Sequence, residues 1–222
     1  MNISPMNTSF YQVLQTYMKE SEISIHRKGT ILQTEDSYMY ILLGGMLQYY
    51  RTLDKFKLNS LTLNLIFDNS LFGNFEHSVS NCVCFSYYKC ITNIKIMKLK
   101  NSQFVTILKQ EPEYVHMFFK MFYQRLIDTE KFLAILSHKE IGNRLAHFLL
   151  LIANYYGIST SRGIFININL SHETIANILN TTRVTITRLM GEFRRIKMIQ
   201  IQGRKIILLR PIALSDYLNL VQ

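Results

Sequence analysis

Residues 170–199, LSHETIANILNTTRVTITRLMGEFRRIKMI, carry the pattern of two short helices with a tight turn between them. Ser171 is a helix N-cap residue, and Glu173 lies near the positive end of the helix dipole. The first helix then has an apolar face at helical spacing, formed by Ile175, Ile178 and Leu179. Asn180 follows, and asparagine is the non-glycine residue that most readily takes a left-handed backbone. The turn is therefore expected at Asn180.

The second helix has two chemically distinct sides. Thr181 and Thr182 supply its N-cap. Its core side consists of Ile186, Leu189, Met190 and Phe193, which fall within roughly 60° of arc at about 100° per residue. The other side carries Val184, Thr187, Arg188, Gly191 and Arg195. Arginine can bridge guanine O6 and N7, while threonine and valine can contact a thymine methyl, so this side favours a helix in the major groove of DNA. Spacing alone leaves open an ordinary amphipathic pair with a solvated basic face.

Positive charge is concentrated around this helix pair. The chain of 222 residues has a formal net charge of +10. From Lys139 onward there are eleven Lys and Arg against four Asp and Glu, and between Arg183 and Arg210 there are eight basic residues and one acid, Glu192. A polyanion is the expected partner. The basic residues alternate with core positions, which disfavours a membrane surface.

The stretch after the helix pair, residues 198–211, gives two β-runs about a turn at residues 202–205. A hairpin in this place is a wing, whose tip residues Arg204 and Lys205 would contact backbone phosphates. A solvated turn is the alternative. His172, just inside the first helix, is interpreted as a phosphate neighbour or a cap and not as a catalyst.

Upstream of the pair lies a long predicted helix. Residues 101–109 give a short helix, Pro112 suits a helix start, and residues 113–136 contain no Gly or Pro. Phe118, Phe122, Leu126, Thr129, Leu133 and Leu136 recur at three- and four-residue steps, and Tyr114, Met117, Met121 and Ile135 widen the apolar surface. Such a helix is buried on more than one side. It is either the hub of a larger core or, as we favour, paired with its twin in a dimer. Ser137 and His138 form a hinge before the next helix, 140–156, which ends at Gly157; a strand, 164–170, leads into the helix pair.

The first hundred residues have a mainly β-rich pattern. Residues 1–20 resemble a short leading helix. Short β-rich runs follow at residues 23–32, 37–53, 57–67 and 82–99, separated by turn residues. These predict an antiparallel barrel or sandwich of roughly 80 residues. The runs contain no nucleophile elbow, phosphate loop, paired acidic motif or histidine cluster, so we expect no enzyme, and an active site in the barrel is a third and weakest hypothesis.

Three cysteines, Cys82, Cys84 and Cys90, are expected to be simple buried or half-buried thiols. On a strand they would share a face, but about 3.3 Å per residue puts Cys90 about 20 Å from Cys84, too far for one metal ion. The chain has no apolar run near the ~18 residues of a spanning helix and no secretory signal at its start. We therefore expect an intracellular protein without a membrane partner.

Together these features resemble the Crp/Fnr family of transcription regulators, and within it the nitrogen-control branch of cyanobacteria and plastids. The resemblance is carried by GNRLAHFLL (142–150), GI with LSHETIA (163–176) and TTRVTITRLMGEFRRIKMI (181–199), and more loosely by YILLGG (40–45) and SLFG (70–73). It implies the α+β class: an antiparallel β-roll like the cyclic-nucleotide-binding domains (1–110), a long dimerisation helix (111–137) and a winged helix-turn-helix domain (138–222). It also implies a plastid or bacterial cytoplasmic location.

By the same resemblance, the protein is a homodimer that binds a palindromic promoter site in double-stranded DNA and recruits RNA polymerase. Arg183, Val184 and Arg188 would read bases, and Thr182 with neighbouring hydroxyls would contact phosphates. The resulting DNA-binding set is Ser171, His172, Thr182, Arg183, Val184, Thr187, Arg188, Arg204 and Lys205. No cofactor or metal is required. The different-class alternative is a ligand-sensing or scaffolding protein whose winged domain contacts protein.

The nitrogen-control branch binds 2-oxoglutarate in a pocket of the β-roll. The resemblance places Phe72, Gly73, Arg125 and Glu130 at matching positions, but Cys84 stands where that branch has an arginine, and the loop 74–83 is one residue shorter. Losing one charged hydrogen-bond partner costs about 1.5–3 kcal/mol, roughly ten- to a hundredfold in affinity. We therefore predict weak or absent 2-oxoglutarate binding, or another ligand.

Overall fold

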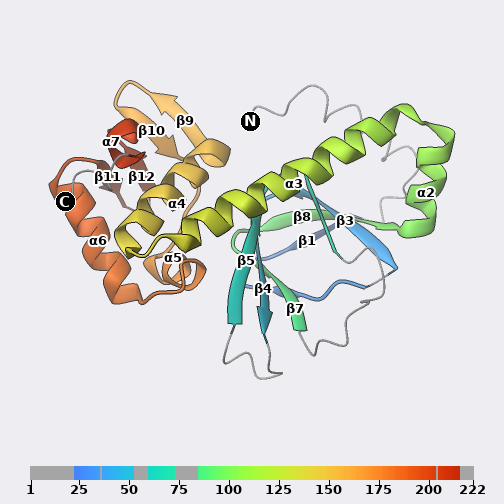
Figure 1. The fold of residues 1–222 in the computed structure, drawn as a ribbon, viewed down its shortest axis with the longest axis horizontal. Coiled ribbons are helices and arrows are strands. Elements are labelled where there is room, and N and C mark those ends of the chain that lie inside the picture. Colours follow the sequence, from blue (N-terminus) through green and yellow to red (C-terminus); the bar gives the residue numbers. More distant parts are fainter. Residues whose placement is uncertain (1–22, 36, 53–59, 74–84, 204, 216–222) are drawn as a thin grey trace. The chain divides into compact units, whose positions relative to one another are not determined.

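The computed structural model describes residues 23–35, 37–52, 60–73, 85–203 and 205–215 (Figure 1). The chain divides into two compact units, residues 1–130 and 131–222. The predicted leading helix over residues 1–20 lies outside the described residues. So do Cys82, Cys84, Arg204 and the loop 74–83.

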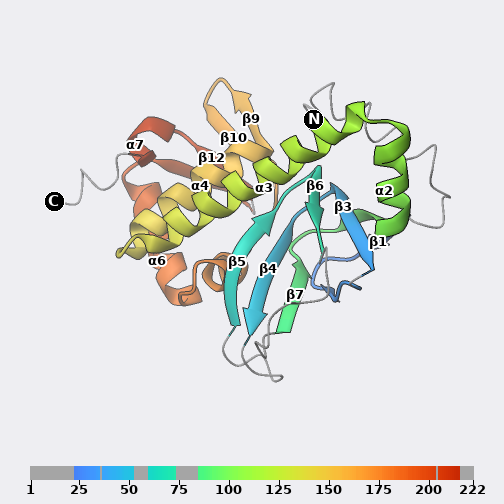
Figure 2. The same ribbon diagram turned by 45° about the vertical axis from the view of Figure 1, so that its right-hand side comes forward.

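The first unit contains two antiparallel four-stranded sheets (Figure 2). One sheet has the strand order β1-β8-β3-β6 and the other has the order β2-β7-β4-β5. The strands are β1 (Ile23–His26), β2 (Ile31–Leu32), β3 (Tyr38–Gly44), β4 (Leu47–Thr52), β5 (Ser60–Ile66), β6 (Ser70–Phe72), β7 (Phe85–Cys90) and β8 (Ile94–Lys100). The predicted antiparallel β-roll is confirmed, and with it the α+β class.

Strand β3 is buried on both faces, which is why its sequence reads as an apolar run and not as an alternation. Tyr40 and Leu42 face the space between the two sheets, where they belong to one core with Phe72 and Tyr88. The alternate residues of β3 face the helical side. Met39 and Ile41 belong to a second core with residues of α2 and α3.

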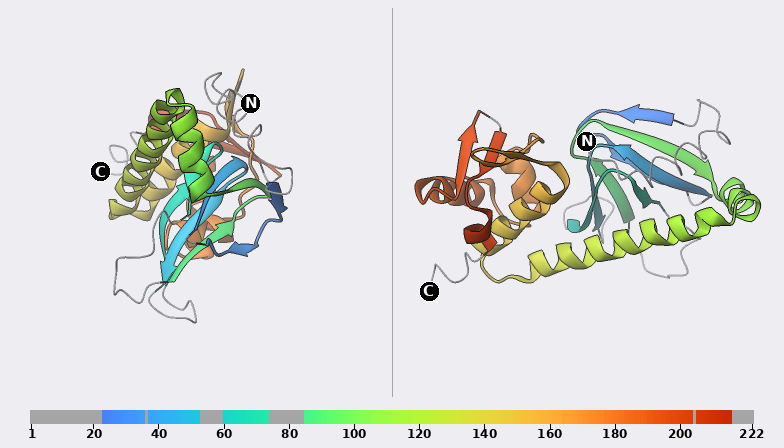
Figure 3. Two further views of the ribbon diagram at one scale, coloured as in Figure 1. Left: turned by 90° about the vertical axis from the view of Figure 1, so that its right-hand side faces the viewer. Right: turned by 90° about the horizontal axis from the view of Figure 1, so that it is seen from above.

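Helix α2 (Asn101–Gln110) completes this unit, and α3 (Glu113–Ser137) begins in it and ends in the second unit; Figure 3 draws them in green to yellow-green. Both were predicted within a residue or two of these bounds. Phe104 and Ile107 of α2 and Met121 of α3 are buried against the outer face of the first sheet. The first half of α3 is therefore fixed on one side by the roll.

The second unit combines helices with one antiparallel sheet of order β11-β12-β10-β9. Its elements are α4 (Ile141–Tyr156), β9 (Gly157–Thr160), β10 (Gly163–Ile166), α5 (His172–Ile178), α6 (Arg183–Arg195), β11 (Ile199–Gln202), β12 (Lys205–Leu208) and α7 (Pro211–Ser215). The predicted hairpin after the helix pair is present as β11 and β12, paired from Ile199 with Leu208 to Gln202 with Lys205.

The stretch before α5 differs from the prediction. The strand expected over residues 164–170 is β10, which ends at Ile166, and its partner β9 was not foreseen. Gly163 begins β10 with φ +136°, and a Cβ there would lie 2.1 Å from the Leu208 carbonyl oxygen. Only glycine allows β12 to approach this closely.

Among the described helices, none is long and apolar enough to span a bilayer. Within the same described part of the chain, no group of three or more His, Cys, Asp or Glu could hold a metal ion. Cys90 is buried in the roll, and burial raises the pKa of its thiol to about 11, so it is an unreactive core thiol as predicted.

Candidate nucleic-acid interface

Helices α5 and α6 begin with the same cap. The Ser171 Oγ accepts a hydrogen bond from the Thr174 backbone N–H, and the Thr182 Oγ1 accepts one from the Thr185 backbone N–H, each over 3.1 Å. Between the helices Asn180 has φ 52°, the left-handed turn conformation expected for it. Both predicted caps and the predicted turn are therefore confirmed.

The two sides of α6 are as the periodicity predicted. Ile186, Leu189, Met190 and Phe193 are all buried. On the opposite side the Val184 side chain is 78% exposed, and the Arg188 side chain is 68% exposed. We call the exposed residues Arg183, Val184, Thr187 and Arg188 the reading face. It presents two arginines and two methyl-bearing side chains from the first two turns of one helix.

Two contacts fix side chains on the reading face. The Arg188 Nη1 lies 3.6 Å from the Glu192 Oε2, one turn along α6. The Thr187 Oγ1 donates to the Arg183 backbone carbonyl oxygen over 2.9 Å, and it also lies 2.9 Å from the Nδ1 of His172 on α5. His172, predicted as a phosphate neighbour or cap, thus contacts the reading face directly.

The other residues predicted to contact phosphates differ in their local contacts. The hydroxyls of Ser171 and Thr182 serve as caps, and each also lies within 2.9 Å of the threonine hydroxyl three residues on. Lys205 is exposed at the start of β12, with its Nζ 5.1 Å from the centre of the Phe165 ring. Arg204, the other predicted wing residue, lies outside the described residues.

Arg144 is a residue whose role the sequence did not reveal. From α4 its Nε donates to the His138 carbonyl oxygen over 2.7 Å, just beyond the end of α3. Its Nη1 donates to the carbonyl oxygen of Leu179, the C-cap of α5, over 3.4 Å. One guanidinium thus connects the predicted hinge with the turn that precedes α6. The only sequence signal was a single arginine on a mostly apolar helix.

The comparisons with known proteins agree with this geometry. Residues 143–217 match the family described as a Crp-like helix-turn-helix domain. A global nitrogen regulator from a Nostoc species is 32% identical over 178 residues, which cover 80% of this chain and 79% of that protein. The chain belongs to the Crp/Fnr family of transcription regulators. It is also 29% identical to the HTH-type transcriptional regulator ycf28 of Porphyra purpurea, over 87% of this chain and 80% of that one.

Solved structures show the same Crp/Fnr fold. A CooA variant from Carboxydothermus hydrogenoformans matches with a TM-score of 0.71 and 20% identity, covering 92% of this chain and 89% of that one. FixK2 from Bradyrhizobium japonicum matches with a TM-score of 0.69 and 19% identity, covering 87% and 95%. With the family match and the likeness to the nitrogen regulators, the helix pair and wing are those of a DNA-binding transcription regulator.

In the roll of this Crp/Fnr regulator, three of the four residues predicted for an effector lie together around Tyr88. The Gly73 backbone N–H donates to the Tyr88 hydroxyl over 3.3 Å, and the Phe72 and Tyr88 ring centres are 5.1 Å apart. Burial raises the pKa of the Tyr88 phenol, although nearby Arg125 opposes that rise. The Arg125 Nη1 donates to the Leu71 carbonyl oxygen over 2.9 Å.

The fourth predicted effector residue, Glu130, is exposed on α3 five residues after Arg125. Tyr88 itself was missed. Its signal was present in the period-two pattern of β7, where it belongs to the same core as Cys90. The Tyr88 hydroxyl and the Arg125 guanidinium are thus polar groups that lie beside Phe72 and Gly73.

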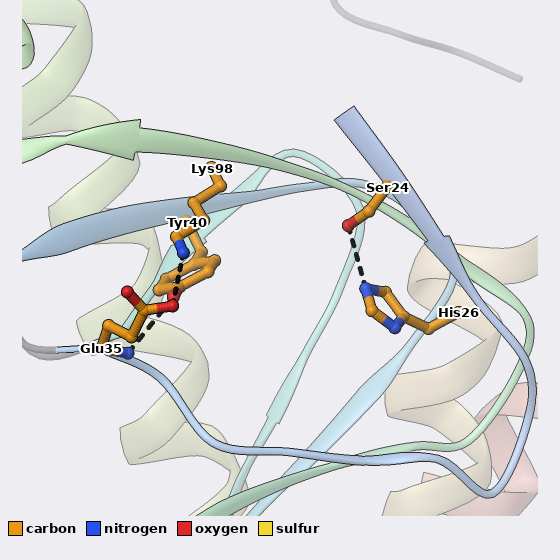
Figure 4. A network of polar contacts seen from close by, with 5 residues as sticks. All are labelled: Ser24, His26, Glu35, Tyr40 and Lys98. Carbon is orange, nitrogen blue, oxygen red and sulfur yellow. Dashed lines mark hydrogen bonds and ion pairs between the residues drawn. The ribbon is translucent and has the colours of Figure 1, made fainter. Parts of the chain in front are cut away.

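Two further groups of polar contacts lie in the described part of the roll. Figure 4 shows the Ser24 Oγ 2.9 Å from the His26 Nε2, and separately Lys98 paired with Glu35, whose backbone N–H donates to the Tyr40 hydroxyl. The Ser24–His26 pair is exposed and two residues apart on one strand. In Figure 4 the Glu35 carboxylate is paired with Lys98 and lies apart from Ser24 and His26, so it does not orient the histidine as a nucleophilic triad requires.

Proposed function

We propose that this regulator is a homodimer that reads a palindromic promoter site with the reading face of α6 and contacts flanking phosphates with its wing. The observation that supports this most is Val184, 78% exposed between basic residues on a helix whose other side is fully buried. Exposing a valine side chain to water does not stabilise the folded protein. In a major groove it can contact a thymine methyl while Arg188 bridges a guanine.

The DNA-contacting side chains fall into two groups, those that contact bases and those that lie near phosphates. Arg183, Val184, Thr187 and Arg188 contact base edges. Ser171, His172, Thr182, Arg204 and Lys205 lie near phosphates. Phosphate contacts position a protein without reading sequence. Substitutions in the first group should therefore reduce sequence preference, and substitutions in the second should reduce the affinity for all DNA.

A mobility-shift assay with a duplex selected from a random pool tests this assignment. Arg188→Ala should cost about 1–3 kcal/mol on the selected site and lose the sequence preference. Lys205→Ala should weaken binding to all DNA about equally and reduce the salt slope by about one for each wing. Arg162→Ala, which removes the same charge from the exposed turn between β9 and β10, is the matched control and should leave specificity unchanged.

Retention of full specificity by Arg188→Ala would show that α6 is not the reading helix. The alternative, in which the winged unit contacts a protein, has its own signature. It predicts a DNA affinity that hardly depends on salt, whereas phosphate binding makes the affinity fall steeply.

We further infer three functional parts: a sensing roll (1–110), a dimerisation helix (111–137) and the DNA-binding unit (138–222). The likeness to global nitrogen regulators supports a role in nitrogen control, in a bacterial cytoplasm or a plastid, with RNA polymerase as the partner at the promoter. We assign the sensor to the first part because it holds Tyr88, a buried phenol that Arg125 of the adjoining helix approaches and that contact with DNA does not need.

For the roll we propose weak or absent binding of 2-oxoglutarate. A dianion needs charged donors for both carboxylates, and Cys84 cannot provide the bidentate contact of an arginine. Arg125 would also have to leave the Leu71 carbonyl or share its donors with it. Calorimetry on the purified protein should detect no 2-oxoglutarate binding in the micromolar range, whereas Cys84→Arg should strengthen it about ten- to a hundredfold. A micromolar dissociation constant for the wild-type protein would overturn this proposal.

A further inference from the structure

The contact between His172 and Thr187 joins the first residue of α5 to the reading face of α6. The two residues are fifteen positions apart in the chain, and their Nδ1 and Oγ1 atoms lie 2.9 Å apart. His172 is half-buried, whereas Thr187 is exposed. The contact therefore lies at the edge of the surface that faces DNA in the proposed function.

Counting hydrogens assigns the direction of this contact. A threonine hydroxyl has one hydrogen, and that of Thr187 is donated to the Arg183 carbonyl oxygen. Toward His172 the same oxygen must accept. The Nδ1 of His172 therefore carries a hydrogen, and the Nε2 is not used by this contact.

The consequence for Thr187 is a fixed side chain. In a helix, threonine divides between two χ1 rotamers, because its hydroxyl can bond to a carbonyl one turn back. Here a second hydrogen bond, from another helix, holds the hydroxyl in one place. The methyl branch is then the group that Thr187 has left for the groove, three residues from the exposed Val184.

We propose that His172 is a positioning residue that orients the Thr187 methyl toward a thymine methyl in the major groove, so that it sets part of the sequence preference without reading a base. This inference rests on the proposed function. It gives the reading face two kinds of contact: arginines for guanine, and the methyls of Val184 and Thr187 for thymine. It also gives His172 a role distinct from a phosphate contact.

The test compares thymine with uracil, which lacks only the methyl. The probe is the duplex selected by the wild-type full-length protein, and one thymine of one half-site is replaced by uracil at a time. At the base under Thr187 the wild type should bind the uracil duplex about fourfold more weakly, the effect of about 0.8 kcal/mol for one buried methyl. Thr187→Ser, which keeps the hydroxyl and loses the methyl, should bind both duplexes equally at that base.

Two histidine variants separate positioning from phosphate contact. The amide of asparagine has a nitrogen at the same distance along the side chain as Nδ1, and the amide of glutamine has one at the distance of Nε2. His172→Asn should therefore keep the fourfold preference for thymine, and His172→Gln should lose it. Both variants should bind an unrelated duplex within about twofold of each other.

Equal thymine preference in Thr187→Ser and the wild type would refute methyl reading by Thr187. Retention of the preference by His172→Gln, with weaker binding to every duplex, would instead make His172 a phosphate contact and would also overturn the inference. A different result would contradict the proposed function, namely that Arg188→Ala keeps the sequence preference. If Arg188→Ala loses that preference while Thr187→Ser changes nothing, only the present inference fails.

Discussion

The Thr182 hydroxyl already makes hydrogen bonds within the protein itself, without DNA. It caps α6 by accepting the Thr185 N–H over 3.1 Å, and it lies 2.9 Å from the Thr185 hydroxyl. Thr182 caps α6 and, in the proposed function, also lies near a phosphate, so its side chain must meet two requirements. Capping needs an oxygen acceptor, whereas a nearby phosphate excludes negative charge.

This conflict predicts a separation of stability from DNA affinity at Thr182. Thr182→Ala should lower the free energy of unfolding by about 1 kcal/mol, because the cap is lost. Thr182→Asp should keep the stability, because aspartate caps at least as well, but weaken binding to all DNA and more so at low salt. Thermal melts and mobility shifts at two salt concentrations measure both effects. Undiminished DNA binding by Thr182→Asp would place this residue away from the phosphates.

Residue-level predictability depended on periodicity. The core residues Ile186 and Phe193 and the exposed Val184 follow from about 100° per residue along one helix, so the sequence alone placed them. The His172–Thr187 contact and the two carbonyl contacts of Arg144 join different elements or the segments beside them. Their atoms meet only because α5, α6 and α4 pack in one unit, and no spacing along the chain encodes that packing.

At the scale of elements, the segment between α3 and α4 brings two histidines together. The rings of His138 and His147 are stacked, with centres 4.7 Å apart and planes 9° apart. Burial, followed by the nearby His138, lowers the pKa of His147 from its ordinary value of 6.5. The folded protein thus holds the neutral form of His147 more strongly than the unfolded chain does.

The resulting pH dependence has a definite sign. Between the lowered pKa and about 6.5, the unfolded chain binds more protons than the folded one, so the free energy of unfolding decreases as the pH falls through that range. Above that range this contribution is constant. Melting temperatures from pH 8 to 5 should decrease less in His147→Phe, which keeps a stacked ring without a titrating group. His116→Gln, an exposed histidine on α3, is the control and should retain the wild-type dependence. Identical profiles for His147→Phe and the wild type would refute this assignment.

Predictability of the elements followed their burial pattern. The helices α2, α3, α4 and α6 and the hairpin of β11 and β12 have clear periodicities, and the sequence placed them within a few residues. Strand β9 was missed because all four of its residues are exposed at a sheet edge and no alternation marks them. Strand β6 was missed because three residues beside a turn resemble part of the turn.

At the scale of the whole molecule, α3 retains an apolar stripe that its own unit does not cover. Phe119, Phe122, Tyr123 and Leu126 are 61%, 48%, 62% and 48% exposed. They follow the i, i+3, i+4, i+7 spacing of a helix that packs against a second helix, whereas Met121, on another side, is buried in the roll. A helix at the hub of a core would have this stripe covered by the unit that holds it, whereas a dimerisation helix would leave it for the second copy. Its exposure favours the dimer.

The stripe predicts that a single charge will separate the subunits. In a two-fold pair the same surface meets itself, so Leu126→Lys introduces two like charges and removes two apolar side chains from the interface. Losing burial of about 1.5 kcal/mol or more for each should weaken dimerisation by roughly a hundredfold or more. Sedimentation at micromolar concentration should show monomer for Leu126→Lys and dimer for Val105→Lys, which charges an equally exposed apolar residue on α2 (48%). Each monomer keeps one reading face, so Leu126→Lys should still bind a half-site weakly but lose the tighter binding to a palindrome whose half-sites are about 34 Å apart. A Leu126→Lys protein that still sediments as a dimer would show that another surface joins the subunits.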